Sequence, residues 1–133
     1  MTRKWRGLAL VCATAIMMPS CGHDQQLVSI AVEPTIETFG APNVPVNLDA
    51  GLNVQLRALG SYIHPPVTKD VTNQVTWVSN TPGIATVSSS GLLTATGQDC
   101  GTGLVSATIT TNNAGTVHSS GAIVTGTMTV NVV

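Results

Sequence analysis

The stretch from Val75 to Gly97 constrains the fold more than any other part of the chain, because it contains three short apolar segments separated by two turns. The first turn is predicted at Asn80–Gly83, where proline occupies the second turn position that it prefers. The second is predicted at Ser89–Gly91, since glycine can adopt the positive φ that a tight hairpin needs. Each segment has the length of a strand, so this stretch predicts the centre of a β-sandwich.

Trp77 is expected at the middle of the core, because the other tryptophan, Trp5, lies in an N-terminal segment of different character. Alternate side chains of a strand point to opposite faces of a sheet, which places Val75 on the same face as Trp77. Small residues on the facing strands allow an indole ring to pack closely. The predicted core residues are Trp77, Val75, Ala85, Val87, Leu93, Ala95 and Ile109.

The composition favours an all-β chain. Charged residues make up 8%, aromatic residues 3% and hydrophobic residues 43% of the 133 residues, which is unlike a disordered polyelectrolyte or an aromatic-rich carbohydrate cleft. The polarity comes largely from Ser and Thr and the bulk from Val, and β-branched residues favour the pleated surface of a sheet. The length corresponds to one domain.

Four further segments alternate with the period of a strand and bring the count to about seven. The first is Leu27–Glu33, with Val28, Ile30 and Val32 predicted on the inner face. The others are 52–60, 105–109 and 128–132. The last carries no charge, so we expect it to pair with the preceding strand and to be covered on its other side.

The segment Ser61–Thr72 is predicted to be a connecting loop. It contains Tyr62 and His64, and loops of sandwich proteins often carry recognition, so these two residues form a candidate partner loop. His64 is followed by two prolines, which is equally typical of a surface residue on a stiff turn.

The first twenty residues have the features of an export signal. A basic start is followed by an uncharged apolar run from Gly7 to Met18, which is shorter than the roughly 20 residues that a membrane-spanning helix needs. Met18–Cys21 resembles the lipobox of bacterial lipoproteins, in which the cysteine is acylated and becomes the first residue after cleavage. This predicts a signal peptide over 1–20, lipidation of Cys21 and a short tether over 21–26. The alternative is an ordinary signal cleaved after Ala15, leaving Cys21 a plain thiol.

The exported part of the chain is acidic. Arg57 and Lys69 stand against six carboxylates, which gives a net charge of −4 and disfavours nucleic-acid binding and polybasic attachment to lipid. The predicted contact with the membrane is therefore the acyl chain on Cys21. Cys100 has no companion if Cys21 is acylated, and it could form a disulfide with Cys21 if it is not.

The pieces Asp70–Thr72, Val75–Trp77, Ile84–Val87 and Gly91–Ala95, preceded by the strand Val54–Ala58, resemble the bacterial immunoglobulin-like group 2 (BIG2) family in order and spacing. The resemblance runs from about Val28 to Val132, and the predicted domain covers residues 27–133. It implies an immunoglobulin-like β-sandwich on envelope or surface proteins, often adhesins and phage structural proteins, used as a spacer or binding module and not as a catalyst. The cysteine in 98–103 and a longer loop after Thr111 depart from the family pattern.

Two functions follow as expectations. The first is a non-catalytic, lipid-anchored module of the cell envelope that contacts a protein or a glycan, at the outer membrane if the host is Gram-negative and otherwise at the cell surface. The second is an accessory protein that binds a small ligand or calcium, for which Asp49, Asp70 and Asp99 are the candidates. We expect no enzyme and no cofactor, because the histidines fall on separate loops and no nucleophile motif is present.

Overall fold

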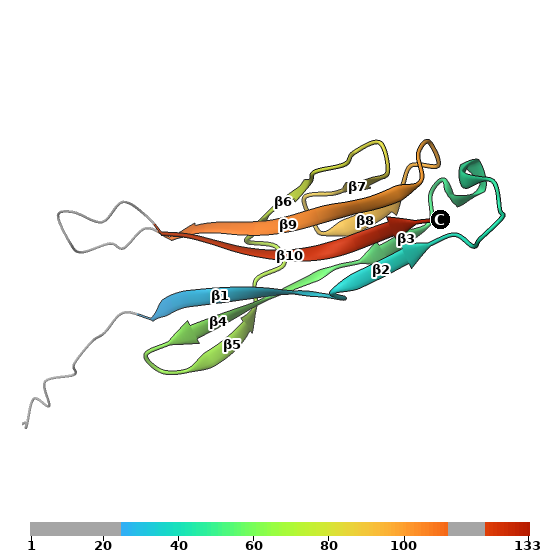
Figure 1. Ribbon diagram of the computed structural model, residues 1–133. Helices are drawn as coiled ribbons and strands as arrows, with labels where there is room; N and C mark the ends of the chain where they lie inside the picture. The colour runs from blue at the N-terminus through green and yellow to red at the C-terminus, as the bar shows by residue number, and fades with distance from the viewer. Residues whose placement is uncertain (1–24, 112–121) are drawn as a thin grey trace, which may run out of the picture.

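The computed structural model describes residues 25–111 and 122–133. The predicted signal peptide and Cys21 lie outside these residues. The described part of the chain is built from strands and one short 3₁₀ helix (Figure 1). The elements are β1 (Gln26–Glu33), β2 (Ile36–Phe39), η1 (Val46–Asp49), β3 (Asn53–Gln55), β4 (Arg57–Ile63), β5 (Val67–Asp70), β6 (Thr76–Ser79), β7 (Ala85–Val87), β8 (Leu92–Ala95), β9 (Gly101–Thr111) and β10 (Ala122–Val132).

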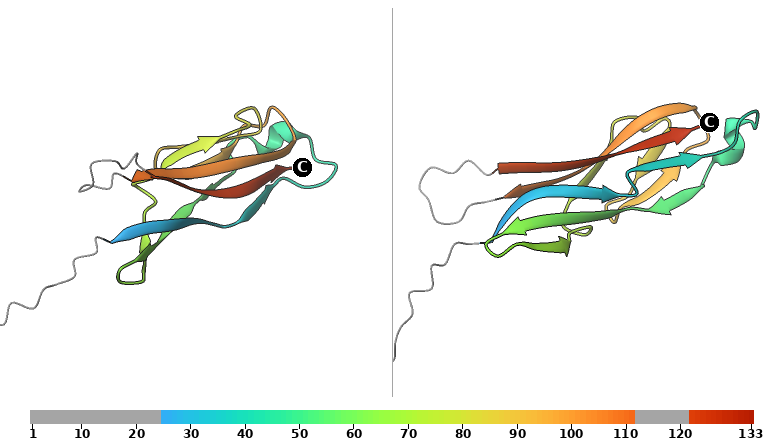
Figure 2. Two further views of the ribbon diagram at one scale, coloured as in Figure 1. Left: turned by 60° about the vertical axis from the view of Figure 1, so that its left-hand side comes forward. Right: turned by 60° about the horizontal axis from the view of Figure 1, so that its bottom comes forward.

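The strands form three hydrogen-bonded sheets, with the orders β1-β4-β5, β2-β10-β9-β6 and β3-β8-β7. Only Leu56 separates β3 from β4, so the first and third sheets share one continuous chain segment and form one bent layer. The four-stranded sheet is the opposite layer, as the turned views show (Figure 2). The predicted all-β sandwich is confirmed.

The described residues form ten strands where about seven were expected, and local features explain the difference. Pro34 cannot donate a ladder hydrogen bond, and the first predicted strand ends there. The chain then continues as β2, which pairs in parallel with β10 in the other layer. The predicted strand 52–60 is divided at Leu56, because β3 pairs with β8 whereas β4 pairs with β1. The third additional strand is β5.

The prediction for Val28 is wrong. The pairing of β1 with β4 shifts between Leu27 and Ser29, which is the signature of a β-bulge. The bulge interrupts the alternation, so Leu27 is buried and Val28 is 46% exposed. Ile30 and Val32 lie beyond the bulge and point into the core.

The prediction of a loop over Ser61–Thr72 is also wrong for most of its length. β4 extends to Ile63 and pairs with β5, so the turn is confined to His64–Pro66. Every residue of β5 is exposed, which leaves no alternation of apolar and polar residues to indicate a strand.

The core lies between the two layers, and Trp77 is 8% exposed within it. Val75, Ala85, Leu93 and Ala95 are buried in the same cluster, whereas Val87 and Ile109 are partly buried and pack against its margin. A Cβ on Gly91 would lie 3.1 Å from the indole ring, so glycine is needed there for close packing as well as for its positive φ.

The last strand is paired on both sides, as expected. β10 pairs with β9 over its whole length and with β2 at its C-terminal end. Its inner residues Met128, Val130 and Val132 are all buried.

Candidate binding site

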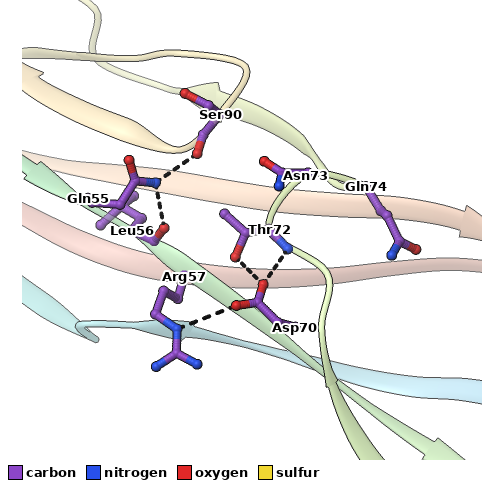
Figure 3. A pocket seen from close by; sticks show the side chains of 8 residues that line it. All are labelled: Gln55, Leu56, Arg57, Asp70, Thr72, Asn73, Gln74 and Ser90. Atoms are coloured by element: carbon purple, nitrogen blue, oxygen red, sulfur yellow. Dashed lines mark hydrogen bonds and ion pairs between the residues drawn. The ribbon is translucent and has the colours of Figure 1, made fainter.

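A polar hollow of about 560 Å³ opens on the surface beside the junction of β3 and β4 (Figure 3). Three segments far apart in the sequence form it: the β3–β4 junction, the end of β5 with the connection to β6, and the turn between β7 and β8. The lining residues are Gln55, Leu56, Arg57, Asp70, Thr72, Asn73, Gln74 and Ser90.

One wall is organised by Asp70. Its Oδ1 accepts hydrogen bonds from the Thr72 hydroxyl at 2.6 Å and from the Thr72 backbone amide at 3.0 Å. Its Oδ2 lies 3.5 Å from Nε of Arg57. The hydrogen bonds from the Thr72 side chain and backbone, with a smaller contribution from the Arg57 charge, lower the pKa of Asp70 below its usual value. The carboxylate is therefore ionised and fixed, and the Arg57 charge balances it.

Thr72 connects this wall to the core. Its hydroxyl accepts a hydrogen bond from the backbone amide of Ala58 at 3.0 Å, and its carbonyl accepts one from Nε1 of Trp77 at 3.0 Å. Thr72 is itself buried. The position of Asp70 is therefore set by residues that belong to the folded interior.

The opposite wall is organised by Gln55. Its side-chain amide donates to the carbonyl of Ser90 at 2.7 Å and to the carbonyl of Leu56 at 2.9 Å. These bonds tie the β7–β8 turn to the β3–β4 junction. Among the described residues, the exposed side-chain amides of Asn73 and Gln74 make no hydrogen bond, so their donors and acceptors are available at the rim.

The hollow presents amides, hydroxyls, a guanidinium group and a carboxylate. An amide has both donors and an acceptor, which suits it to a neutral ligand with hydroxyl groups. The lining includes the hydroxyls of Thr72 and Ser90 and the carboxylate of Asp70. The Thr72 hydroxyl donates to Asp70, and the Ser90 hydroxyl pairs with that of Ser88 at 2.9 Å. The arrangement is suited to holding a polar ligand by hydrogen bonds.

The structure does not bring the candidate partner loop to this hollow. Tyr62 lies in β4, partly buried, with Nζ of Lys69 4.9 Å from the centre of its ring. His64 lies in the β4–β5 turn with a φ of 63°. Tyr62 lies five positions along β4 from Arg57, which corresponds to about 17 Å.

The candidate calcium ligands are also dispersed. Asp49 is buried with no hydrogen-bond partner for its Oδ2, while Asp70 lines the hollow and Asp99 is exposed. Within residues 25–111 and 122–133, no three His, Cys, Asp or Glu side chains are grouped so that they could hold a metal ion.

Cys100 is exposed, and the predicted lipidation site and the Cys21–Cys100 alternative lie outside the described residues. No helix in the described ranges has the length and hydropathy required to span a bilayer. Neither a scan against family models nor a search of curated proteins finds a match to the sequence.

Sequence reasoning missed Gln55, Arg57, Asn73, Gln74 and Ser90 as lining residues. One local signal was present. In the segment 70–72, Asp70 stands two positions before Thr72. At this spacing a carboxylate can accept a hydrogen bond from the backbone amide of the later residue. The other residues meet only through tertiary pairing.

Proposed function

We propose that this protein is a non-catalytic, lipid-anchored protein of the bacterial envelope whose single immunoglobulin-like module, of the BIG2 type, binds a neutral glycan in the hollow beside β3 and β4. The observation that carries the proposal is the composition of that hollow. Its one guanidinium and its one carboxylate are paired with each other, and the remaining polar groups are neutral amides and hydroxyls. Such a surface favours a ligand that is polar but uncharged.

The placement of the hollow agrees with an anchor at Cys21. Gln26 pairs with Ile63, so the start of β1 and the β4–β5 turn lie at the same end of the module (Figure 1). The five residues after Cys21 reach roughly 17 Å, so this end would face the membrane. The hollow lies further along β4, where a ligand can approach without passing the lipid surface.

The lipid anchor is tested by intact mass. The membrane-extracted protein should begin at Cys21 and carry the mass of a diacylglycerol adduct, and Cys21→Ser should move the protein to the soluble fraction. A membrane-extracted protein without the adduct would refute the anchor and leave the proposal for the hollow unaffected.

Glycan binding is tested with a double variant. Asn73→Ala with Gln74→Ala removes the two free amides at the rim, and Asn47→Ala with Gln98→Ala removes two exposed amides outside it. On an array of neutral envelope polysaccharides, with charged peptidoglycan strands as the comparison, the rim variant should lose binding and the control should retain it.

The result that would overturn glycan binding is equal behaviour of both variants, or no binding by the parent protein. The same variants can be compared in a pull-down from crosslinked envelopes. If the parent protein captures a protein partner and the rim variant does not, the hollow is assigned to protein recognition.

A further inference from the structure

The β4–β5 hairpin projects from the end of the module at which β1 begins (Figure 1). β5 pairs with β4 alone, and all of its residues are exposed, including Val67 at 38%. Pro65 and Pro66 in the turn are exposed and Ile63 is partly exposed. On the other side of β4, Val28 in β1 is 46% exposed. This end of the module therefore presents apolar surface that the described residues leave uncovered.

The chain enters the module beside the tip of this hairpin. Gln26, the first residue of β1, pairs with Ile63, the last residue of β4. Nζ of Lys69 donates to Oε1 of Gln25 and lies 4.9 Å from the centre of the Tyr62 ring. Since the strand order is β1-β4-β5, this side chain reaches from β5 across β4 to the segment before β1. The hairpin and the entry point of the chain are therefore held together.

The charges at this end suit a lipid surface. Residues 25–31 and 61–69 contain no carboxylate, and Lys69 is their only lysine or arginine. Of the six carboxylates in the exported chain, Asp24 belongs to the predicted tether and the others lie outside these two ranges. Tyr62 adds an aromatic ring with a polar hydroxyl. Tyrosine and lysine beside apolar residues are typical of the boundary between a membrane and water.

The length of chain before β1 brings this end within reach of lipid. The five residues after Cys21 span at most roughly 17 Å. β10 has 11 residues and is about 36 Å long, so the module is longer than its tether. The opposite end of the module can therefore reach the bilayer only if the module lies flat. The hairpin tip needs no such rotation, because it lies beside the entry point of the chain.

We infer that the tip of the β4–β5 hairpin, residues 63–67, is a second contact with the membrane and enters the boundary between lipid headgroups and acyl chains. An interfacial amphipathic segment enters this boundary by about 5–10 Å. Ile63 and Val67 then lie against the acyl chains, while the Tyr62 hydroxyl and the Lys69 ammonium stay at the headgroups. The inference rests on the proposed lipid anchor and adds that the hairpin fixes the orientation of the module on the bilayer.

The test compares the depth of a fluorescent probe at three exposed apolar positions. Val67→Cys places the probe at the tip, Leu48→Cys in η1 at the opposite end, and Val78→Cys on the outward face of β6, each in a Cys100→Ser background. The membrane-extracted protein, whose Cys21 is blocked by acylation, is labelled with nitrobenzoxadiazole. It is then returned to phosphatidylcholine vesicles that contain lipids with a nitroxide on the upper acyl chain.

The nitroxide should quench the label at Val67 at least about twofold more than the label at either other position, and the emission of that label should shift to shorter wavelength. Leu48 and Val78 are 65% and 53% exposed, so a contact governed by apolar exposure alone would quench them more than Val67. Quenching at Val67 that is no stronger than at Leu48 or Val78 would overturn the inference.

A second arm separates the hairpin contact from the anchor. A histidine tag in place of residues 1–21 holds the chain on nickel-chelating lipid through the same entry point without acylation, and Val67→Cys should again carry the most strongly quenched label. If intact mass shows no adduct on Cys21 but this order holds, the anchor is refuted and the hairpin contact is supported. If the adduct is present and the order is lost, the hairpin contact is refuted and the anchor is supported.

Discussion

Truncation of Trp77 to alanine should remove a large share of the stability of this domain. The indole is buried beside Gly91, and Ala107 lies opposite it on β9. Replacing a buried tryptophan by alanine costs about 3–5 kcal/mol through lost burial and the cavity that remains. The substitution also removes the donor to the Thr72 carbonyl, and an unpaired buried carbonyl costs about 1–3 kcal/mol. The total approaches the roughly 5–15 kcal/mol that holds a domain folded.

Urea unfolding followed by far-UV circular dichroism measures this effect without needing the tryptophan signal. In a thermal scan followed by the same signal, Trp77→Ala should lower the melting temperature by at least about 12 °C if it folds at all. Trp77→Phe retains most of the ring volume but loses the hydrogen bond, so its loss should be smaller than that of alanine. Val78→Ala, on the outward face of the same strand, should change stability by only about 0.5 kcal/mol. If Trp77→Ala unfolds at the same urea concentration as the parent, the packing argument is wrong.

Three further predictions concern the polar wall and the contact between the layers. Thr72→Val should lower the free energy of unfolding by about 1–3 kcal/mol, because the amide of Ala58 loses its acceptor in a buried position; an unchanged value would show that water replaces the hydroxyl. Because the pKa of Asp70 is lower in the folded protein than the value of 3.8 in the unfolded chain, the ionised carboxylate stabilises the fold above that value. This stabilisation is lost as the pH falls through the folded-state pKa. Asp70→Asn should therefore make the free energy of unfolding depend less on pH below pH 4. Gly126→Ala should lower the free energy of unfolding by about 1–3 kcal/mol, because the added Cβ would overlap a backbone carbonyl of β1. The control Gly83→Ala should be tolerated, because its Cβ meets only the end of an exposed side chain. Similar melting temperatures for the two variants would contradict the close approach of β1 and β10.

The strands around Trp77 could be predicted because the information that specifies them is local. Period-two alternation and the glycine and proline turns lie within one stretch of sequence, and they fix both strand identity and the inner face. Val28 was wrongly predicted on the inner face because a β-bulge depends on the partner strand. The sequence of β1 or of β4 alone does not determine the register between them.

The hollow could not be predicted because its walls come from three segments whose proximity depends on sheet pairing. Gln55 and Ser90 are 35 residues apart in sequence and meet through a side-chain hydrogen bond to a backbone carbonyl. Sequence patterns instead drew attention to Tyr62 and His64, two residue types common in binding sites, which the hairpin places at the other end of β4.

Thr72 makes the core and the hollow one structural unit. Its carbonyl accepts a hydrogen bond from the indole of Trp77, and its backbone amide and hydroxyl donate hydrogen bonds to the carboxylate of Asp70. A ligand held by the Asp70 wall would therefore favour the same conformation of Thr72 that the packed indole requires, so ligand binding should raise the stability of the core. Conversely, loss of the indole should loosen the wall even though the ring itself does not line the hollow. A chain with so few aromatic residues thus uses its buried tryptophan to position a polar surface as well as to fill the interior.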